Sequence, residues 1–176
     1  MIDFVVYCRK EACNTVTTSN ENGVDRLVIE ASKNFRGKYA EWFKGMSQDQ
    51  IPVINFIMVG LEKQNNAHQV RTYLLSSQAN FSLQLATDGC MLAGVVQYAI
   101  YLKHRFYDVN MGLEQAMRLA VYLITETATQ DPKVGGPIRA AQITGDGFSQ
   151  LSDEQVSRII QENEEQNKTL KSFFMK

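Results

Sequence analysis

The sequence predicts an α+β fold in which helices pack on antiparallel strands. The first observation is a run of apolar residues at helical spacing from Val24 to about Phe43. The second is a group of three strand-like runs, over Pro52–Leu61, Val70–Ser76 and Phe81–Thr87. The third is a pair of consecutive helical patterns, over Cys90–Phe106 and Met111–Thr127. Two helices that follow a strand meander favour an antiparallel helix pair lying on a sheet.

Length and charge limit the class of protein. A chain of 176 residues is expected to form one domain, spanning 1–176, with a sizeable core. Eighteen basic and nineteen acidic residues leave a net charge of −1. This balance gives no electrostatic basis for binding nucleic acid or an anionic membrane, so neither is expected as a partner.

Cysteine and histidine are sparse. The three cysteines, Cys8, Cys13 and Cys90, are odd in number and lack a repeated short spacing, which argues against a disulfide framework. With only His68 and His104 beside them, a zinc site is not expected, and we predict neither a metal nor a cofactor. The chain begins without a signal-peptide pattern and has no apolar run of membrane-spanning length, so we expect a cytoplasmic location.

The first half of the chain alternates strands and one helix. Asp3–Cys8 and Thr15–Ser19 read as short strands, and the polar segment after them turns into the helix that begins near Val24. The aromatic stripe of this helix is expected in the core. Pro52–Leu61 is almost continuously apolar, which predicts a strand buried on both faces.

The second half is mostly helical. After a helix from about Cys90 to Phe106, a second helix is predicted from an apolar stripe that contains Leu113, Met117, Ala120 and Ile124. Asp131-Pro132 ends that helix and Gly135-Gly136 allows a turn into a strand over 138–143. A further short strand contains Phe148. Ser152 and Gln155 form a capping box that opens the last helix.

The order of these elements resembles the proteasome-type N-terminal-nucleophile (Ntn) hydrolases. Four segments carry the resemblance, which covers about 24–144: VDRLVIEASKNFRGKYAEWF, PVINFIMVG, VRTYLLSSQANFSLQLATDG and MGLEQAMRLAVYLITETATQDPKVGGPIRAAQIT. The resemblance implies a four-layer α/β/β/α sandwich with antiparallel sheets, its first strands missing or incomplete. It therefore implies an N-terminally truncated, proteasome subunit-like chain.

The family's catalytic residues are not found at the start of this chain. Family enzymes use an amino-terminal threonine as nucleophile, followed by an aspartate and a lysine before the first helix. Only about twenty-two residues precede that helix here, too few for the strands that carry these groups. Thr15, Thr17 and Thr18 are expected to be structural, and Lys33 lies inside the helix, where it cannot take the role of the family lysine.

Two residues remain as catalytic candidates, Asp131 and Cys90. Asp131 matches the aspartate of the family's glycine corner, but Val134 stands where a serine is expected, and a valine cannot donate a hydrogen bond. Asp131 is either a remnant of the catalytic support network or a corner-forming residue, and we favour the corner. Cys90 at a helix start would have a lowered pKa, yet neither histidine can be placed beside it, which favours a packed thiol.

Two functions follow from the resemblance. The first is a proteasome-like subunit or fragment without its own nucleophile, which has a structural or assembly role and pairs with copies of itself or with other proteasome-like subunits. The alternative is a threonine-type peptidase or amidohydrolase, acting on peptides, whose catalytic segment lies upstream of Met1. An upstream reading frame that begins with a threonine-led strand would decide for the alternative.

Overall fold

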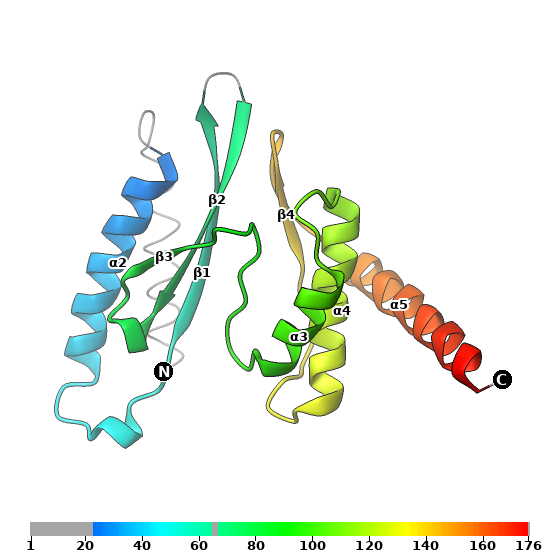
Figure 1. The fold of residues 1–176 in the computed structure, drawn as a ribbon. Helices are drawn as coiled ribbons and strands as arrows, with labels where there is room; N and C mark the ends of the chain where they lie inside the picture. Colours follow the sequence, from blue (N-terminus) through cyan, green and yellow to red (C-terminus); the bar gives the residue numbers. More distant parts are fainter. Residues whose placement is uncertain (1–22, 65–66, 176) are drawn as a thin grey trace. The chain divides into compact units, whose positions relative to one another are not determined.

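The structure is a computed structural model that describes residues 23–64 and 67–175. It divides into two compact units, Met1–Ala93 and Gly94–Lys176 (Figure 1). The strands expected over Asp3–Cys8 and Thr15–Ser19 lie outside the described residues. The single domain expected over 1–176 stays a prediction.

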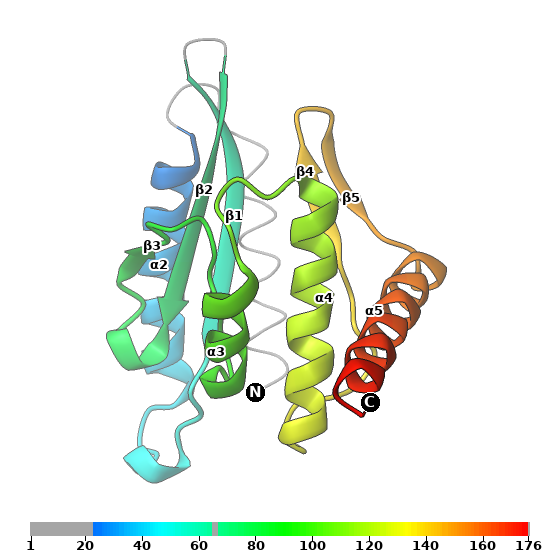
Figure 2. The same cartoon turned by 45° about the vertical axis from the view of Figure 1, so that its right-hand side comes forward.

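The first unit places one long helix on a three-stranded antiparallel sheet (Figure 2). The elements are α2 (Gly23–Trp42), β1 (Asn55–Gln64), β2 (Ala67–Ser76) and β3 (Leu83–Leu85), in the sheet order β1-β2-β3. Short 3₁₀ turns lie at Gln48–Gln50 and Ser77–Ala79. The helix and the antiparallel strands predicted from the sequence are confirmed.

The core of the first unit is aromatic. Phe35 of α2 lies 4.7 Å from Phe56 and 6.1 Å from Phe81, measured between ring centroids. Tyr39, one turn further along α2, lies 5.3 Å from Phe81, and its hydroxyl donates to the carbonyl of Pro52 at 2.7 Å. Edge-to-face rings at these separations stabilise a core beyond the area they bury. The aromatic stripe of α2 therefore fills the core, as its spacing predicted.

Two backbone positions allow this packing. A Cβ atom on Gly60 of β1 would lie 2.5 Å from a methyl carbon of Val24, so α2 can approach the sheet only over a glycine. Phe81 has a φ of +53°, which a bulky side chain rarely adopts. The Ser32 hydroxyl donates to the Phe81 carbonyl, and the Phe81 N–H donates to the Ser76 carbonyl at 2.7 Å. Packing and hydrogen bonds together hold this strained residue.

The expectation that the first long strand is buried on both faces is wrong. Phe56 and Met58 of β1 pack toward α2, whereas Ile57 and Val59 between them are 42 and 45 % exposed. Their cross-strand neighbours on that face are Leu74 and Thr72. The helix covers one face of the sheet, and side chains alternate between faces, so every second apolar residue remains accessible.

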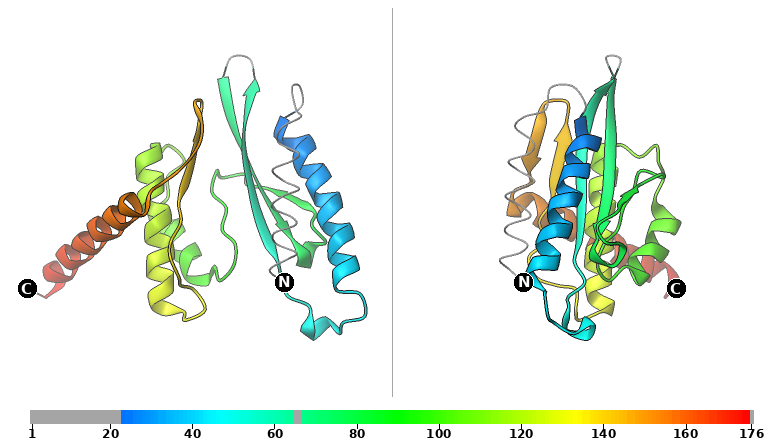
Figure 3. Two further views of the ribbon diagram at one scale, coloured as in Figure 1. Left: turned by 180° about the vertical axis from the view of Figure 1, so that it is seen from behind. Right: turned by 90° about the vertical axis from the view of Figure 1, so that its left-hand side faces the viewer.

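The second unit contains three helices and a two-stranded antiparallel hairpin (Figure 3). Its elements are α3 (Gln97–Phe106), α4 (Leu113–Gln130), β4 (Ala141–Thr144), β5 (Gly147–Gln150) and α5 (Asp153–Phe174). Its core comprises Val121, Leu151, Val156 and Ile159. Together the units form a mixed helix and sheet structure with antiparallel sheets, in agreement with the predicted α+β class.

Two expectations for the second half need correction. The helix predicted from Cys90 begins only at Gln97, because Gly94 has a φ of +92°, which a right-handed helix cannot contain. The apolar stripe predicted for α4 is largely wrong, since Leu113, Ala120 and Ile124 are exposed and only Met117 is partly buried. The α4 residues that the structure buries are Val121, Leu123 and Thr127.

The last helix begins where the sequence predicts. The Gln155 N–H donates to the Ser152 hydroxyl at 3.2 Å, and the Ser152 N–H donates to the side-chain oxygen of Gln155 at 2.8 Å. This reciprocal pair satisfies two of the amide donors that a helix start leaves without partners. In the described part of the chain, no helix combines the length and apolar character needed to cross a bilayer.

Candidate functional site

The glycine corner after α4 is a backbone turn organised by Asp131. The Asp131 N–H donates to the Thr127 carbonyl at 2.9 Å and ends α4. Its carboxylate accepts the Lys133 N–H at 2.8 Å, and its carbonyl accepts the Val134 N–H at 3.0 Å. Asp131 thus shapes the corner, which is the role we favoured. A catalytic role for it stays a prediction.

A hollow of about 420 Å³ lies beside this corner. Its lining combines the second half of α4 with the corner: Ile124, Thr125, Ala128, Thr129, Gly135, Gly136, Pro137, Ile138 and Arg139. The hydroxyls of Thr125 and Thr129 donate to carbonyls of α4, at 2.9 and 2.7 Å. Arg139 is the one charged residue of this lining. The hollow therefore pairs apolar walls with a cation, and its lining offers no general base beside a hydroxyl.

Cys90, the second candidate, lies in the first unit and Asp131 in the second. The Cys90 N–H donates to the Asp88 carboxylate at 3.3 Å, in a turn that precedes no helix directly. Cys90 therefore does not lie at the helix start where the sequence placed it. The thiol is half-buried, as expected for a packed cysteine.

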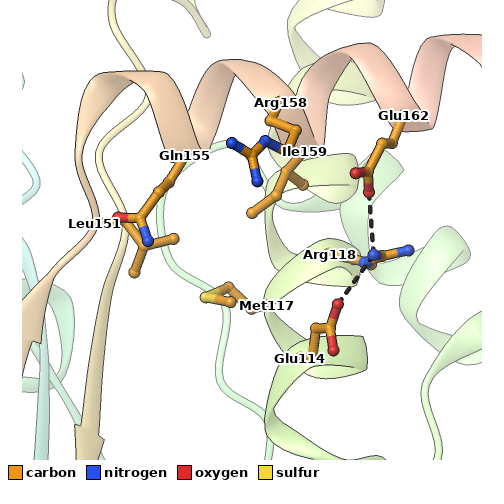
Figure 4. A pocket seen from close by; sticks show the side chains of 8 residues that line it. All are labelled: Glu114, Met117, Arg118, Leu151, Gln155, Arg158, Ile159 and Glu162. Carbon is orange, nitrogen blue, oxygen red and sulfur yellow. Dashed lines mark hydrogen bonds and ion pairs between the residues drawn. The ribbon is translucent and has the colours of Figure 1, made fainter.

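A groove between α4 and α5 has a volume of about 290 Å³ (Figure 4). Its apolar part is built by Met117, Leu151 and Ile159. At one end the Arg118 guanidinium contacts Glu114 at 2.9 Å and Glu162 at 3.1 Å, which ties the two helices together. An arginine between two carboxylates has its charge compensated, so this end presents no net cation to a ligand.

The other polar side chains of the groove come from α5. Gln155, Arg158 and Glu162 follow one another at helical spacing and extend from the same side of α5 as Ile159 (Figure 4). We did not anticipate this groove from the sequence. The sequence does show that Glu114, Met117 and Arg118 share one face of a helix, and that the α5 residues share another. Periodicity alone does not show that these two faces pack against each other.

The first unit holds a polar cluster at the start of α2. The Tyr73 hydroxyl donates to the Asp25 carboxylate, and Arg71 lies 3.5 Å from Glu62. Burial, and then the hydrogen bond to Asp25, raises the pKa of Tyr73 to about 12. A phenol that retains its proton so firmly is a poor nucleophile or base. This cluster instead fastens the first turn of α2 to the sheet.

The metal-ligating residue types do not gather within the described ranges. There, no group of three His, Cys, Asp or Glu side chains is placed to hold a metal ion. His104 lies exposed on α3, as expected from its position. The His68 side chain lies outside the description.

The fold class, mixed helix and antiparallel sheet, now has a counterpart among known structures. No protein-family model matches the chain, and no curated protein sequence matches it. Among solved structures, the fold is similar to Anbu (ancestral beta-subunit) from Yersinia bercovieri, with a TM-score of 0.68. The two are 17 % identical over 98 % of this chain and 73 % of the other.

These comparisons correct the family assignment made from the sequence. We expected an N-terminally truncated member of the proteasome-type Ntn-hydrolase family, and that assignment is wrong as stated, since no family model supports it. The comparison supports a similarity of fold to a proteasome-like protein. At 17 % sequence identity, it does not transfer the roles of individual residues to this chain.

Proposed function

We propose that this chain is a proteasome-like subunit without its own catalytic nucleophile, whose role is to assemble with other subunits. The observation that carries the proposal is the similarity of fold to Anbu, an ancestral beta-subunit, over 98 % of the chain. Beta-subunits by name belong to multi-subunit particles, and most soluble oligomers are symmetric assemblies of like subunits. The proposed partners are copies of this chain or other proteasome-like subunits.

The chemistry of the described residues supports a role without hydrolysis. Activating a hydroxyl or thiol requires an adjacent base or a lowered pKa. At the glycine corner, Val134 has no hydrogen-bonding side chain, and the Asp131 carboxylate already accepts a backbone N–H. Cys90 does not lie at a helix start, and the pKa of Tyr73 is raised rather than lowered.

Exposed apolar surface supports the assembly role. In the second unit, Ile124 of α4 and Phe173 of α5 are accessible. Apolar surface of this kind on a folded protein marks sites of association. The proposal also includes a four-layer sandwich and a cytoplasmic location.

Light scattering and a fluorogenic peptide assay on the same sample test the proposal. We expect a discrete oligomer that does not cleave the peptides. A monomer at micromolar concentration would contradict the assembly role. Turnover that is lost in Cys90→Ala would identify Cys90 as a nucleophile and contradict the proposal. Turnover unchanged in Cys90→Ala would instead favour a peptidase or amidohydrolase that uses another nucleophile.

A further inference from the structure

The last turn of α5 is apolar and accessible. We use the name α5 tip for its four large apolar residues, Leu170, Phe173, Phe174 and Met175. Phe173 and Phe174 are 72 and 74 % exposed, and the centroids of their rings lie 5.4 Å apart. Within its unit, α5 contacts α4 from Val156 to Asn167, whose amide donates to Glu126, and the tip lies beyond these contacts (Figures 1 and 3). Two neighbouring exposed phenylalanines on a folded helix indicate a contact surface.

The groove of Figure 4 offers an apolar site that the tip of the same molecule cannot fill. Ile159 in the groove and Phe174 in the tip belong to one continuous helix. A rise of 1.5 Å per residue separates them by about 22 Å. Any α5 tip that enters the groove must therefore come from another molecule.

The charges of α5 favour a second copy in the opposite direction. All five acidic residues of α5 lie in its first two-thirds, together with Arg158, and both lysines lie in its last third. If Phe174 of one copy lies opposite Ile159 of another, antiparallel helices bring Lys171 opposite Glu162 and Lys168 opposite Glu165. The same register applies in both directions, so each copy offers a tip and a groove. Opposed helix dipoles are compatible with this arrangement.

We propose that two copies of this chain associate through antiparallel α5 helices, with the α5 tip of each seated in the α4–α5 groove of the other. A phenylalanine buries about 150–250 Å². Two per copy, with Leu170, Met175 and the flanking helix surface, approach the roughly 800 Å² per partner of a stable interface. This pairing specifies one interface of the proposed assembly. It rests on the proposed function only in requiring that the chain forms an oligomer.

Cross-linking tests the geometry directly. In the proposed register Glu162, which lines the groove, lies opposite Lys171 of the other copy. We expect Glu162→Cys and Lys171→Cys proteins to form an intermolecular disulfide when they are mixed under oxidising conditions. A Gln48→Cys protein, altered at an exposed site of the first unit, is the matched control and should not cross-link to Lys171→Cys. Equal cross-linking of both pairs would overturn the proposal.

Size measurements test the energetics. Phe173→Ser with Phe174→Ser should shift the particle to half its mass, whereas Phe148→Ser, at a hairpin residue that is 70 % exposed, should not. Lys171→Glu and Glu162→Lys should each weaken association at least tenfold, and the double variant should recover it. Circular dichroism checks that every variant is folded.

The outcomes separate the two proposals. An oligomer unchanged by the tip variants would overturn the α5 pairing and leave the assembly role standing. A monomeric wild type would overturn both. Peptide cleavage by the dimer would contradict only the absence of a nucleophile.

Discussion

The two compact units have different kinds of hydrophobic core. The first has a core of interlocking aromatic rings, with Phe35, Leu75 and Phe81 almost completely buried. The second has a small aliphatic core around Val121 and Val156. Interlocking aromatic rings fill the core of the first unit, whereas a smaller set of aliphatic side chains fills that of the second.

Polar contacts between the helices of the second unit extend the contrast. Asn163 donates to the Arg118 carbonyl at 3.3 Å, and Asn167 donates to the Glu126 carboxylate at 2.7 Å. These contacts orient α5 along α4. Because these hydrogen bonds fix the orientation of α5 on α4, both helices can expose apolar side chains to solvent.

The largest expected effect is in the aromatic core. Phe35→Ala should lower the free energy of unfolding by about 3–5 kcal/mol, because it removes a fully buried ring and leaves a cavity. The matched change Phe173→Ala, at an exposed ring, should alter unfolding of the isolated subunit by less than about 0.5 kcal/mol. Urea denaturation monitored by circular dichroism measures both. Equal losses would mean that the two units do not differ as described.

The next effect depends on pH. Because burial and Asp25 raise the pKa of Tyr73 from 10 to about 12, the folded state holds the phenol proton more tightly than the unfolded chain. The resulting stability is complete below pH 10 and is lost as the pH rises to about 12. Thermal melts of the wild type and Tyr73→Phe should show a steeper decline for the wild type in this window. Parallel declines would exclude a role for Tyr73 in the pH dependence.

Two glycine-to-alanine substitutions should change the stability of the first unit by smaller amounts and in opposite directions. Gly60→Ala should destabilise the first unit by about 1–3 kcal/mol, because the new methyl group would collide with Val24. Gly37→Ala, in the same unit and with open space around it, should stabilise α2 by about 0.5–1 kcal/mol. Chemical denaturation with a common slope measures both. A stabilising Gly60→Ala would show that α2 is not packed closely on β1.

The smallest effect is expected at the helix bridge. Arg118→Met removes ion pairs to Glu114 and Glu162, but the arginine is about half exposed, so stability should fall by less than about 1 kcal/mol. The measurement is again the denaturation midpoint, compared at low and high salt. A loss of several kcal/mol would mean that the polar bridge, rather than the aliphatic core, determines the stability of the second unit.

Much of the fold was predictable. Helix α2, the meander of β1, β2 and β3, and the capped start of α5 follow from periodicity, turn residues and the Ser152–Gln155 pair. Of the candidate site, the sequence located the corner at Asp131 and its turn. It did not locate the α4–α5 groove, whose halves are separated by more than thirty residues.

The sequence by itself determined which segments become helices and strands, because those choices depend on hydrogen bonds and side-chain spacing within a few residues. Only the tertiary structure decided which faces are buried. Ile57 and Ile124 are as apolar as their neighbours, yet both are exposed, since the elements packed in their own unit contact other faces. It also decided that Cys90 precedes no helix directly, because Gly94, with a positive φ value, lies between it and α3. Burial depends on residues that are distant in the chain, and no local pattern contains that information.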